Sequence, residues 1–343
     1  MKGRRLPIPC AVFLENEYLM TPFTSVPVID IAPFLGGSGA EKRAVAAKVA
    51  RACETIGFLY IDGHGFDPAL IERAASAARA FYALPDDEKR KVEMNRFPNH
   101  RGYVGQFHGK PGSRHDFARW ESFKVGFETP EDDPEFQAGV RFYGPNAWPD
   151  KPADFRPAME AYYAAMLELS RTLFRLFACA LDLDEEYFIP FTGKPASIMN
   201  VNHYLGRGTA GGDQPTGIGA HSDYECFAIL WQDGSGGLQL QNQAGDWIDA
   251  PPIPGTFVIN IGDMLAHWSN DRFASTQHRV VYGGEGNRLS IAHFANCDYT
   301  TPVACLPTCT GPGNPPKYAP TTVGDHLIAS VKRAYSDVDA YKN

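Results

Sequence analysis

Three potential metal ligands in the second half of the chain constrain its fold more than any other feature of the sequence. His221 and Asp223 are two residues apart, and His278 follows 55 residues after Asp223. Side chains at positions i and i+2 of an extended chain project from the same face, so His221 and Asp223 can reach one ion. His278 must then come from a neighbouring strand. The sequence therefore predicts a β-sheet structure in which separate strands meet at a metal ion.

Two histidines and one carboxylate are the ligand set that holds non-haem Fe(II) and leaves coordination positions open for small molecules. We therefore predict that His221, Asp223 and His278 bind Fe(II) and that O2 reaches an open position. The short apolar run at 226–231 suits a buried strand. We expect His221 and Asp223 at the entrance of that strand.

A second pair of polar side chains repeats the two-residue spacing. Arg288 and Ser290 share one face of the expected strand 288–294, while His293 faces the opposite way. A guanidinium group binds a carboxylate through two parallel hydrogen bonds, and a hydroxyl beside it adds a further contact. The pair therefore predicts a binding site for the carboxylate of a keto-acid co-substrate.

The order of these motifs resembles the 2-oxoglutarate- and Fe(II)-dependent dioxygenases of the isopenicillin N synthase-like family. Segments 26–31, 57–65 and 81–85 resemble the N-terminal region of the same family, so the similarity covers roughly residues 26–300. The resemblance implies a mixed α/β fold with a mainly β core. That core would be a double-stranded β-helix, or jelly roll, flanked by N-terminal helices.

The resemblance also implies 2-oxoglutarate as the co-substrate, used together with Fe(II) and O2. Arg288 and Ser290 would bind its distal carboxylate. Asn202-His203-Tyr204 is similar to an N-x-Y element of plant members, so Asn202 and Tyr204 are expected to contact 2-oxoglutarate as well. The implied reaction couples decarboxylation of 2-oxoglutarate to succinate and CO2 with hydroxylation, or a related C–H oxidation, of a small-molecule substrate.

The expected substrate contacts lie in the long stretch 95–126 and beside the metal ligands. A loop of this length is typical of a functional segment, so Arg101, Tyr103 and Glu121 are candidates. Tyr224 and Phe294 are further candidates. The Gly-Pro-Asn-Ala-Trp-Pro element at 144–149 resembles members of the homoarginine hydroxylase type, which makes a guanidino or other amino acid the first substrate class to test.

Two other functions compete with this interpretation. The same three ligands serve oxidases of the family that work without 2-oxoglutarate, and a jelly-roll protein can bind a metal or ligand without catalysis. Arg288, Ser290, Asn202 and Tyr204 together favour the 2-oxoglutarate-dependent enzyme. Asp223 argues against a halogenase, since the family's halogenases carry a small residue at that position.

Composition excludes several classes of partner. The net charge of −8 and the isoelectric point near 5.7 argue against nucleic-acid binding. The N-terminal apolar residues are interrupted by prolines and glutamates, so neither a signal peptide nor a membrane span is expected. Seven cysteines, an odd number, favour reduced thiols and a cytoplasmic location. The sequence leaves the oligomeric state open.

The chain is expected to form a single structural unit with four regions. These are an N-terminal extension at 1–25, a helix-rich region at 26–195, the jelly-roll core at 196–300, and a C-terminal loop and helix at 301–343 that pack on the core. Within them, apolar periodicity predicts helices at 41–56, 68–83 and 155–183.

Overall fold

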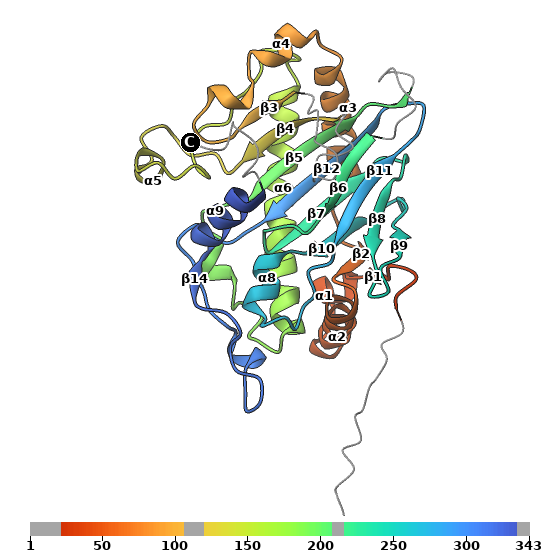
Figure 1. The fold of residues 1–343 in the computed structure, drawn as a ribbon, viewed down its shortest axis with the longest axis vertical. Helices are drawn as coiled ribbons and strands as arrows, with labels where there is room; N and C mark the ends of the chain where they lie inside the picture. The colour runs from red at the N-terminus through yellow and green to blue at the C-terminus, as the bar shows by residue number, and fades with distance from the viewer. Residues whose placement is uncertain (1–21, 106–119, 208–215, 335–343) are drawn as a thin grey trace, which may run out of the picture.

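Two β-sheets face each other and helices cover the outer side of the larger one (Figure 1). The computed structural model describes residues 22–105, 120–207 and 216–334. The architecture is the expected jelly roll, a mainly β core with helices from the first half of the chain. Among the described residues, no helix combines the length and the apolar character needed to cross a bilayer.

The larger sheet has eight strands and the smaller has four. Neighbours in the larger sheet are antiparallel, except that β1 and β2 are parallel. In spatial order its strands are β1 (Val28–Asp30), β2 (Phe58–Asp62), β10 (Phe257–Ile261), β7 (Phe227–Gln232), β12 (Arg288–Ala295), β5 (Ile198–Tyr204), β4 (Trp120–Gly126) and β3 (Gly102–Val104). The smaller sheet contains β6 (Thr216–His221), β11 (His278–Tyr282), β8 (Leu238–Gln241) and β9 (Trp247–Asp249).

The first half of the chain contributes half of the larger sheet. Strands β1 to β4 all precede residue 196 and form both of its edges. The expected regions 26–195 and 196–300 are therefore joined by hydrogen-bonded strand pairs, including β4 with β5 and β2 with β10. The expected loop at 95–126 is corrected here, because it contains β3 and β4. Residues 106–119 of that stretch lie outside the described part.

The two faces of the larger sheet have different surroundings. Alternate side chains of its strands, such as Phe123, Val201 and Ile291, pack against the helices in one hydrophobic core. The intervening side chains face the smaller sheet, where Tyr204 and Val258 belong to a second core. We call these the outer face and the inner face. Parity along each strand decides which residues can reach the space between the sheets.

Three long helices form the cover of the outer face: α2 (Gly39–Thr55), α3 (Pro68–Tyr82) and α6 (Phe155–Ala180). Their bounds agree closely with the predicted helices. Ser38 and Glu41 form a capping box at the start of α2. Gly57 follows its end with φ of 73°, and a Cβ there would lie 2.1 Å from the carbonyl oxygen of Ala274. Glycine is therefore required at this turn.

The remaining elements are short and connect these layers. Residues 32–36 form a short helix with Pro33 in its first turn. The connecting elements are α1 (Ala32–Gly36), α4 (Asp86–Arg90), η1 (Met94–Arg96), α5 (Pro134–Gln137), η2 (Ile189–Phe191), α8 (Asp263–Trp268), β13 (Pro302–Val303), η3 (Pro307–Cys309), β14 (Thr321–Thr322) and α9 (Val323–Ala334).

His293 lies on the outer face of β12, as strand parity predicts. It is completely buried, and its ring meets the edge of Tyr163 on α6 with 5.3 Å between ring centroids. Neither ring nitrogen has a hydrogen-bond partner among the described residues. Burial in this apolar layer disfavours the charged ring and lowers the pKa of His293 to about 3.

This histidine should make the fold sensitive to mild acid. In the unfolded chain it takes up a proton near pH 6.5, whereas the folded protein excludes that proton until about pH 3, so stability falls as pH falls between these values. We expect His293→Phe to remove this dependence. Urea unfolding should show that the free energy of unfolding of the unsubstituted protein falls relative to that of His293→Phe by up to about 1.4 kcal/mol per pH unit below 6.5. Parallel curves between pH 7.5 and 5.5 would contradict the assignment.

Candidate metal centre and co-substrate pocket

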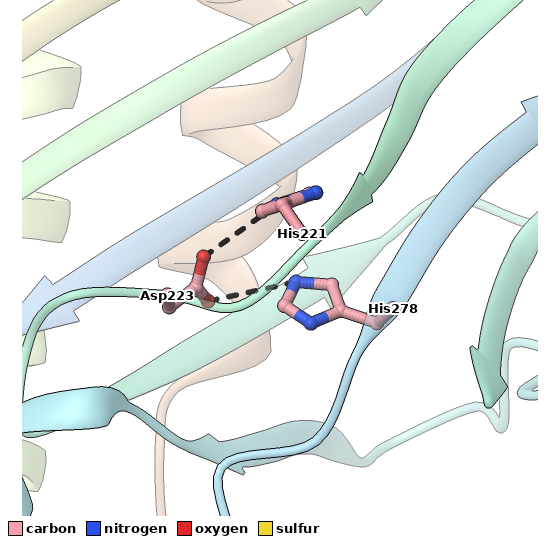
Figure 2. Close-up of side chains that lie close together, drawn as sticks. All are labelled: His221, Asp223 and His278. Carbon is pink, nitrogen blue, oxygen red and sulfur yellow. Dashed lines mark ion pairs between the residues drawn. The ribbon is translucent and has the colours of Figure 1, made fainter. Parts of the chain in front are cut away.

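His221, Asp223 and His278 converge on one point, as the sequence predicts. One ligand atom from each lies within 4.8 Å of the other two. Nε2 of His221 is 3.6 Å from Oδ1 of Asp223, and Nε2 of His278 is 3.7 Å from Oδ2. These separations exceed hydrogen-bond length. Figure 2 shows the three side chains pointing toward a common centre.

The ligands come from two strands and the turn after one of them. His221 is the last residue of β6, and His278 is the first residue of β11 and its direct cross-strand partner. Asp223 lies in the turn that leads from β6 to β7. The neighbouring strand expected for His278 is therefore present. The expected position of His221 at the entrance of the apolar strand is corrected, since a separate strand carries it.

Both histidines present the same nitrogen to the centre. Nδ1 of His221 lies 2.7 Å from the carbonyl oxygen of Gly219, and Nδ1 of His278 lies 3.1 Å from that of Thr276. A carbonyl oxygen only accepts, so Nδ1 carries the hydrogen in each ring, and Nε2 is the nitrogen that each neutral ring offers to a metal. Neutral histidines held in this way are typical metal ligands.

The carboxylate of Asp223 is oriented by Asn260 on β10. Nδ2 of Asn260 donates to Oδ2 of Asp223 at 2.7 Å, and both side chains are buried. This bond occupies one carboxylate oxygen from the side of the larger sheet. It fixes the plane of the carboxylate and leaves Oδ1 directed toward His221.

Asp263 connects the two segments that carry the ligands. Its carboxylate accepts hydrogen bonds from Ser222 at 3.1 Å and from Ser275 at 2.6 Å. Ser222 lies between the first two ligands and Ser275 lies three residues before the third. The preceding Gly262 allows close contact here, because a Cβ would stand 2.1 Å from the carbonyl oxygen of Glu225. Sequence reasoning missed both Asn260, which lies near the end of β10, and Asp263, which begins the helix α8 that follows it.

The donor set fits Fe(II). Two imidazole nitrogens and one carboxylate oxygen approach from one side, which is the facial arrangement of non-haem iron sites with open positions. In the described part of the chain this is the one group of three metal-binding side chains that comes together.

Arg288 lies on the same inner face, at the far end of β12, and is 1% exposed. Its Nε donates to the carbonyl oxygen of Gly236 at 2.6 Å, and its Nη2 donates to Gln232 at 3.0 Å. Nη1 is 3.4 Å from the hydroxyl oxygen of Ser290. None of the carboxylates in the described ranges forms an ion pair with Arg288, so its buried charge suits an acidic ligand.

Tyr204 and Asn202 lie beside this arginine on β5. The strand register pairs Arg288 with Tyr204 and Ser290 with Asn202. The guanidinium carbon of Arg288 stands 4.6 Å from the centre of the Tyr204 ring. Oδ1 of Asn202 accepts a hydrogen bond from Ser122 on β4 at 2.9 Å. The structure thus brings together all four residues expected to bind the keto acid.

Of the expected substrate contacts, Tyr103 and Glu121 lie on the outer face of the larger sheet, and Arg101 directly precedes β3. Glu121 is on the outer face of β4, and its carboxylate accepts a hydrogen bond from the hydroxyl of Tyr103 at 2.6 Å. Arg101 is fully buried, donates to the carbonyl oxygen of Phe142 and packs directly over Gly126. Tyr103 and Glu121 therefore face the helices, which argues against contact with a small molecule. Nε and Nη1 of Arg101 have no hydrogen-bond partner among the described residues, and its contact with the substrate stays a prediction.

The other two candidates stay close to the metal ligands. Tyr224 follows Asp223 directly, and Phe294 lies on the inner face of β12, partly exposed and four residues from Ser290. Two further inner-face residues were not among the predicted contacts: Lys124 and Asn200, which are cross-strand partners on β4 and β5. Oδ1 of Asn200 is buried and has no hydrogen-bond partner within the described ranges.

Comparison with known proteins agrees with this geometry. Residues 195–296 match the model of the 2OG-Fe(II) oxygenase superfamily, and residues 26–151 match that of the N-terminal region of non-haem dioxygenases in morphine synthesis. The chain is 34% identical to the 2-oxoglutarate-Fe(II) type oxidoreductase hxnY of Emericella nidulans, over 93% of each chain. It is 33% identical to homoarginine-6-hydroxylase 2-ODD-C23 of Glycine max, over 93% of this chain and 100% of the relative.

Solved structures give the same result. A full-length protein of Neurospora crassa, crystallised in complex with alpha-KG and thymine, superimposes with a TM-score of 0.75 at 27% identity, covering 91% of this chain and 97% of the fungal protein. The fold and metal centre define a non-haem iron dioxygenase. The chain belongs to the 2OG-Fe(II) oxygenase superfamily, and its reaction uses Fe(II), 2-oxoglutarate and O2.

The bond from Asn260 to Asp223 should tune metal affinity. Partners that orient metal ligands typically contribute 10- to 100-fold to affinity, so we expect Asn260→Ala to raise the Kd for Co(II), measured anaerobically by calorimetry, by about that factor. Asn260→Asp should weaken binding further, because an acceptor then faces the carboxylate. Asn314→Ala, in the C-terminal tail, is the matched control. Unchanged affinity in Asn260→Ala would exclude this role.

Proposed function

We propose that this chain hydroxylates a small polar molecule, with Fe(II) held by His221, Asp223 and His278 and the distal carboxylate of 2-oxoglutarate held by Arg288 and Ser290. One observation carries the assignment. The three ligands converge on one point, and Arg288, buried and without an ion-pair partner among the described residues, lies on the face of the larger sheet that is turned toward the smaller sheet carrying His221 and His278.

The protein's part in this reaction is to bind and orient. With 2-oxoglutarate and O2, bound Fe(II) supplies the oxidation, in which one oxygen atom enters succinate, CO2 leaves and the other oxygen enters the C–H bond of the substrate. Arg288 and Ser290 bind one end of the keto acid, and the ring of Tyr204 packs against the guanidinium group. The enclosing apolar residues of both sheets exclude water from the site.

The substrate would lie over β4 and β5, on the inner face. There Lys124 and Asn200 offer a cation and an amide side by side. The surroundings are positive: burial and then the charges of Lys124, Arg141 and Arg101 lower the pKa of His100 to about 4. An acidic group on the substrate, such as the carboxylate of an amino acid, suits this region. The homoarginine hydroxylases among the relatives agree with that class.

One further part of the proposal rests on the sequence alone. The odd number of cysteines favours a reducing compartment, so we place the protein in the cytoplasm.

An oxidase that works without 2-oxoglutarate is the competing function that the sequence raised. The environment of Arg288 favours the proposed function, because that alternative gives no task to a buried carboxylate-binding arginine.

Succinate release tests the proposed function. Fe(II)-loaded protein given 2-oxoglutarate and then O2 should release succinate. Release should rise when one member of a panel of amino acids is added, and should rise less with the corresponding amide. Equal stimulation by acids and amides would reject the acidic substrate. No succinate under any condition, with iron bound, would favour the 2-oxoglutarate-independent oxidase.

Removing the guanidinium tests the anchor separately. Arg288→Ala should weaken 2-oxoglutarate binding by about 2 to 5 kcal/mol, the range for truncating one partner of a buried charge pair. Anaerobic calorimetry on the Fe(II)-loaded protein measures this change. Arg272→Ala, which loses surface ion pairs with Glu54 and Asp182, serves as the control. An unchanged Kd in Arg288→Ala would reject the anchor.

A further inference from the structure

A buried network of ionisable side chains lies on the outer face of β4 and β5. The carboxylate of Glu121, only 2% exposed, is 2.7 Å from Nζ of Lys89 and 2.9 Å from Nδ1 of His203, and accepts from the hydroxyl of Tyr103 at 2.6 Å. His203 stacks on Tyr82 with 4.7 Å between ring centroids. The network therefore joins α3, α4, β3, β4 and β5.

This carboxylate stays ionised. Burial raises the pKa of Glu121, but the hydrogen bonds from His203, Lys89 and Tyr103 outweigh burial and hold the pKa below its usual value. An ionised carboxylate only accepts, so Nδ1 of His203 carries a hydrogen. A buried ion pair gives little net stability compared with apolar residues of the same volume, and in some proteins such groups serve to fix one arrangement of the chain. Here the network can fix the position of β4 relative to β5.

The opposite side of the same two strands is the keto-acid pocket. Glu121 and His203 are cross-strand partners, and the pairs on either side of them are Trp120 with Tyr204 and Ser122 with Asn202. Alternation along the strands turns these four flanking side chains to the inner face. Tyr204 lies against the guanidinium of Arg288, and Asn202 bonds to Ser122. Figure 1 shows β4, β5 and β12 side by side in the sheet.

We propose that Glu121, Lys89 and His203 are positioning residues for the co-substrate. They touch no ligand. They hold β4 against β5 from the outer face of the sheet. This fixes the positions of Tyr204 and Asn202 relative to Arg288 on the inner face. This inference rests on the proposed keto-acid site and extends it to the helix-covered side of the sheet. It also gives Glu121 a role other than the substrate contact that its sequence suggested.

The test is the affinity for 2-oxoglutarate in Glu121→Gln, measured by anaerobic calorimetry on Fe(II)-loaded protein. We expect a Kd about tenfold higher, which corresponds to about 1.4 kcal/mol. The Kd for Co(II) and kcat at saturating 2-oxoglutarate should stay within about twofold, because the metal ligands lie on other strands. Lys89→Met should raise the Kd for 2-oxoglutarate by a similar factor, and Lys89→Arg should retain most of the affinity for 2-oxoglutarate. Glu185→Gln, which neutralises a carboxylate paired with Lys42 at 2.7 Å, is the control.

A milder variant keeps the test decisive if Glu121→Gln does not fold. Tyr103→Phe removes one hydroxyl and should raise the Kd for 2-oxoglutarate by a smaller factor in the same direction. An unchanged Kd in both variants overturns the proposal, and so does an equal loss of Co(II) and 2-oxoglutarate affinity, which would mean general destabilisation. Arg288→Ala separates the two levels: if it too leaves the Kd unchanged, the proposed keto-acid site itself is wrong.

Discussion

The alternation of side chains along β4, β5 and β12 is the constraint on which the rest of the structure depends. One face of these strands packs against α3 and α6, and the other faces the smaller sheet, which carries His221 and His278. Residues that differ by one position therefore belong to different chemical environments. Leu289 lies in the apolar layer while Arg288 and Ser290 lie in the pocket, and Phe123 is buried under helices while Ser122 bonds to Asn202.

Much of the metal centre could be predicted from the sequence because its ligands have distinctive chemistry and short-range spacing. His221 with Asp223, and Arg288 with Ser290, are two residues apart, and a distance of that kind has a direct geometric meaning in an extended chain. The helices were also predictable, since apolar periodicity and the glycine at position 57 are local signals. These features needed no knowledge of which strands pair.

The remaining features depend on contacts between distant segments. In the sequence, Asn260 is a single polar residue in an apolar strand. Its role follows only from the fold, which brings β10 next to Asp223. Glu121 sits in a stretch of mixed composition that reads as a loop, and its burial follows from the pairing of β4 with β5, far apart in the sequence. The position of His221 on β6 was missed for a related reason: the glycine-rich residues before it hide the strand.

The strict alternation also limits how such an enzyme can diverge. Inserting or deleting one residue at the start of β5 would turn Val201 and His203 toward the pocket and Asn202 and Tyr204 toward the helices, unless a bulge absorbed the change. Insertions are therefore tolerated best in the connections between strands. New specificity must arise there, or by single replacements at inner-face positions such as Lys124 and Asn200. The architecture thus allows its pocket to change while its register stays the same.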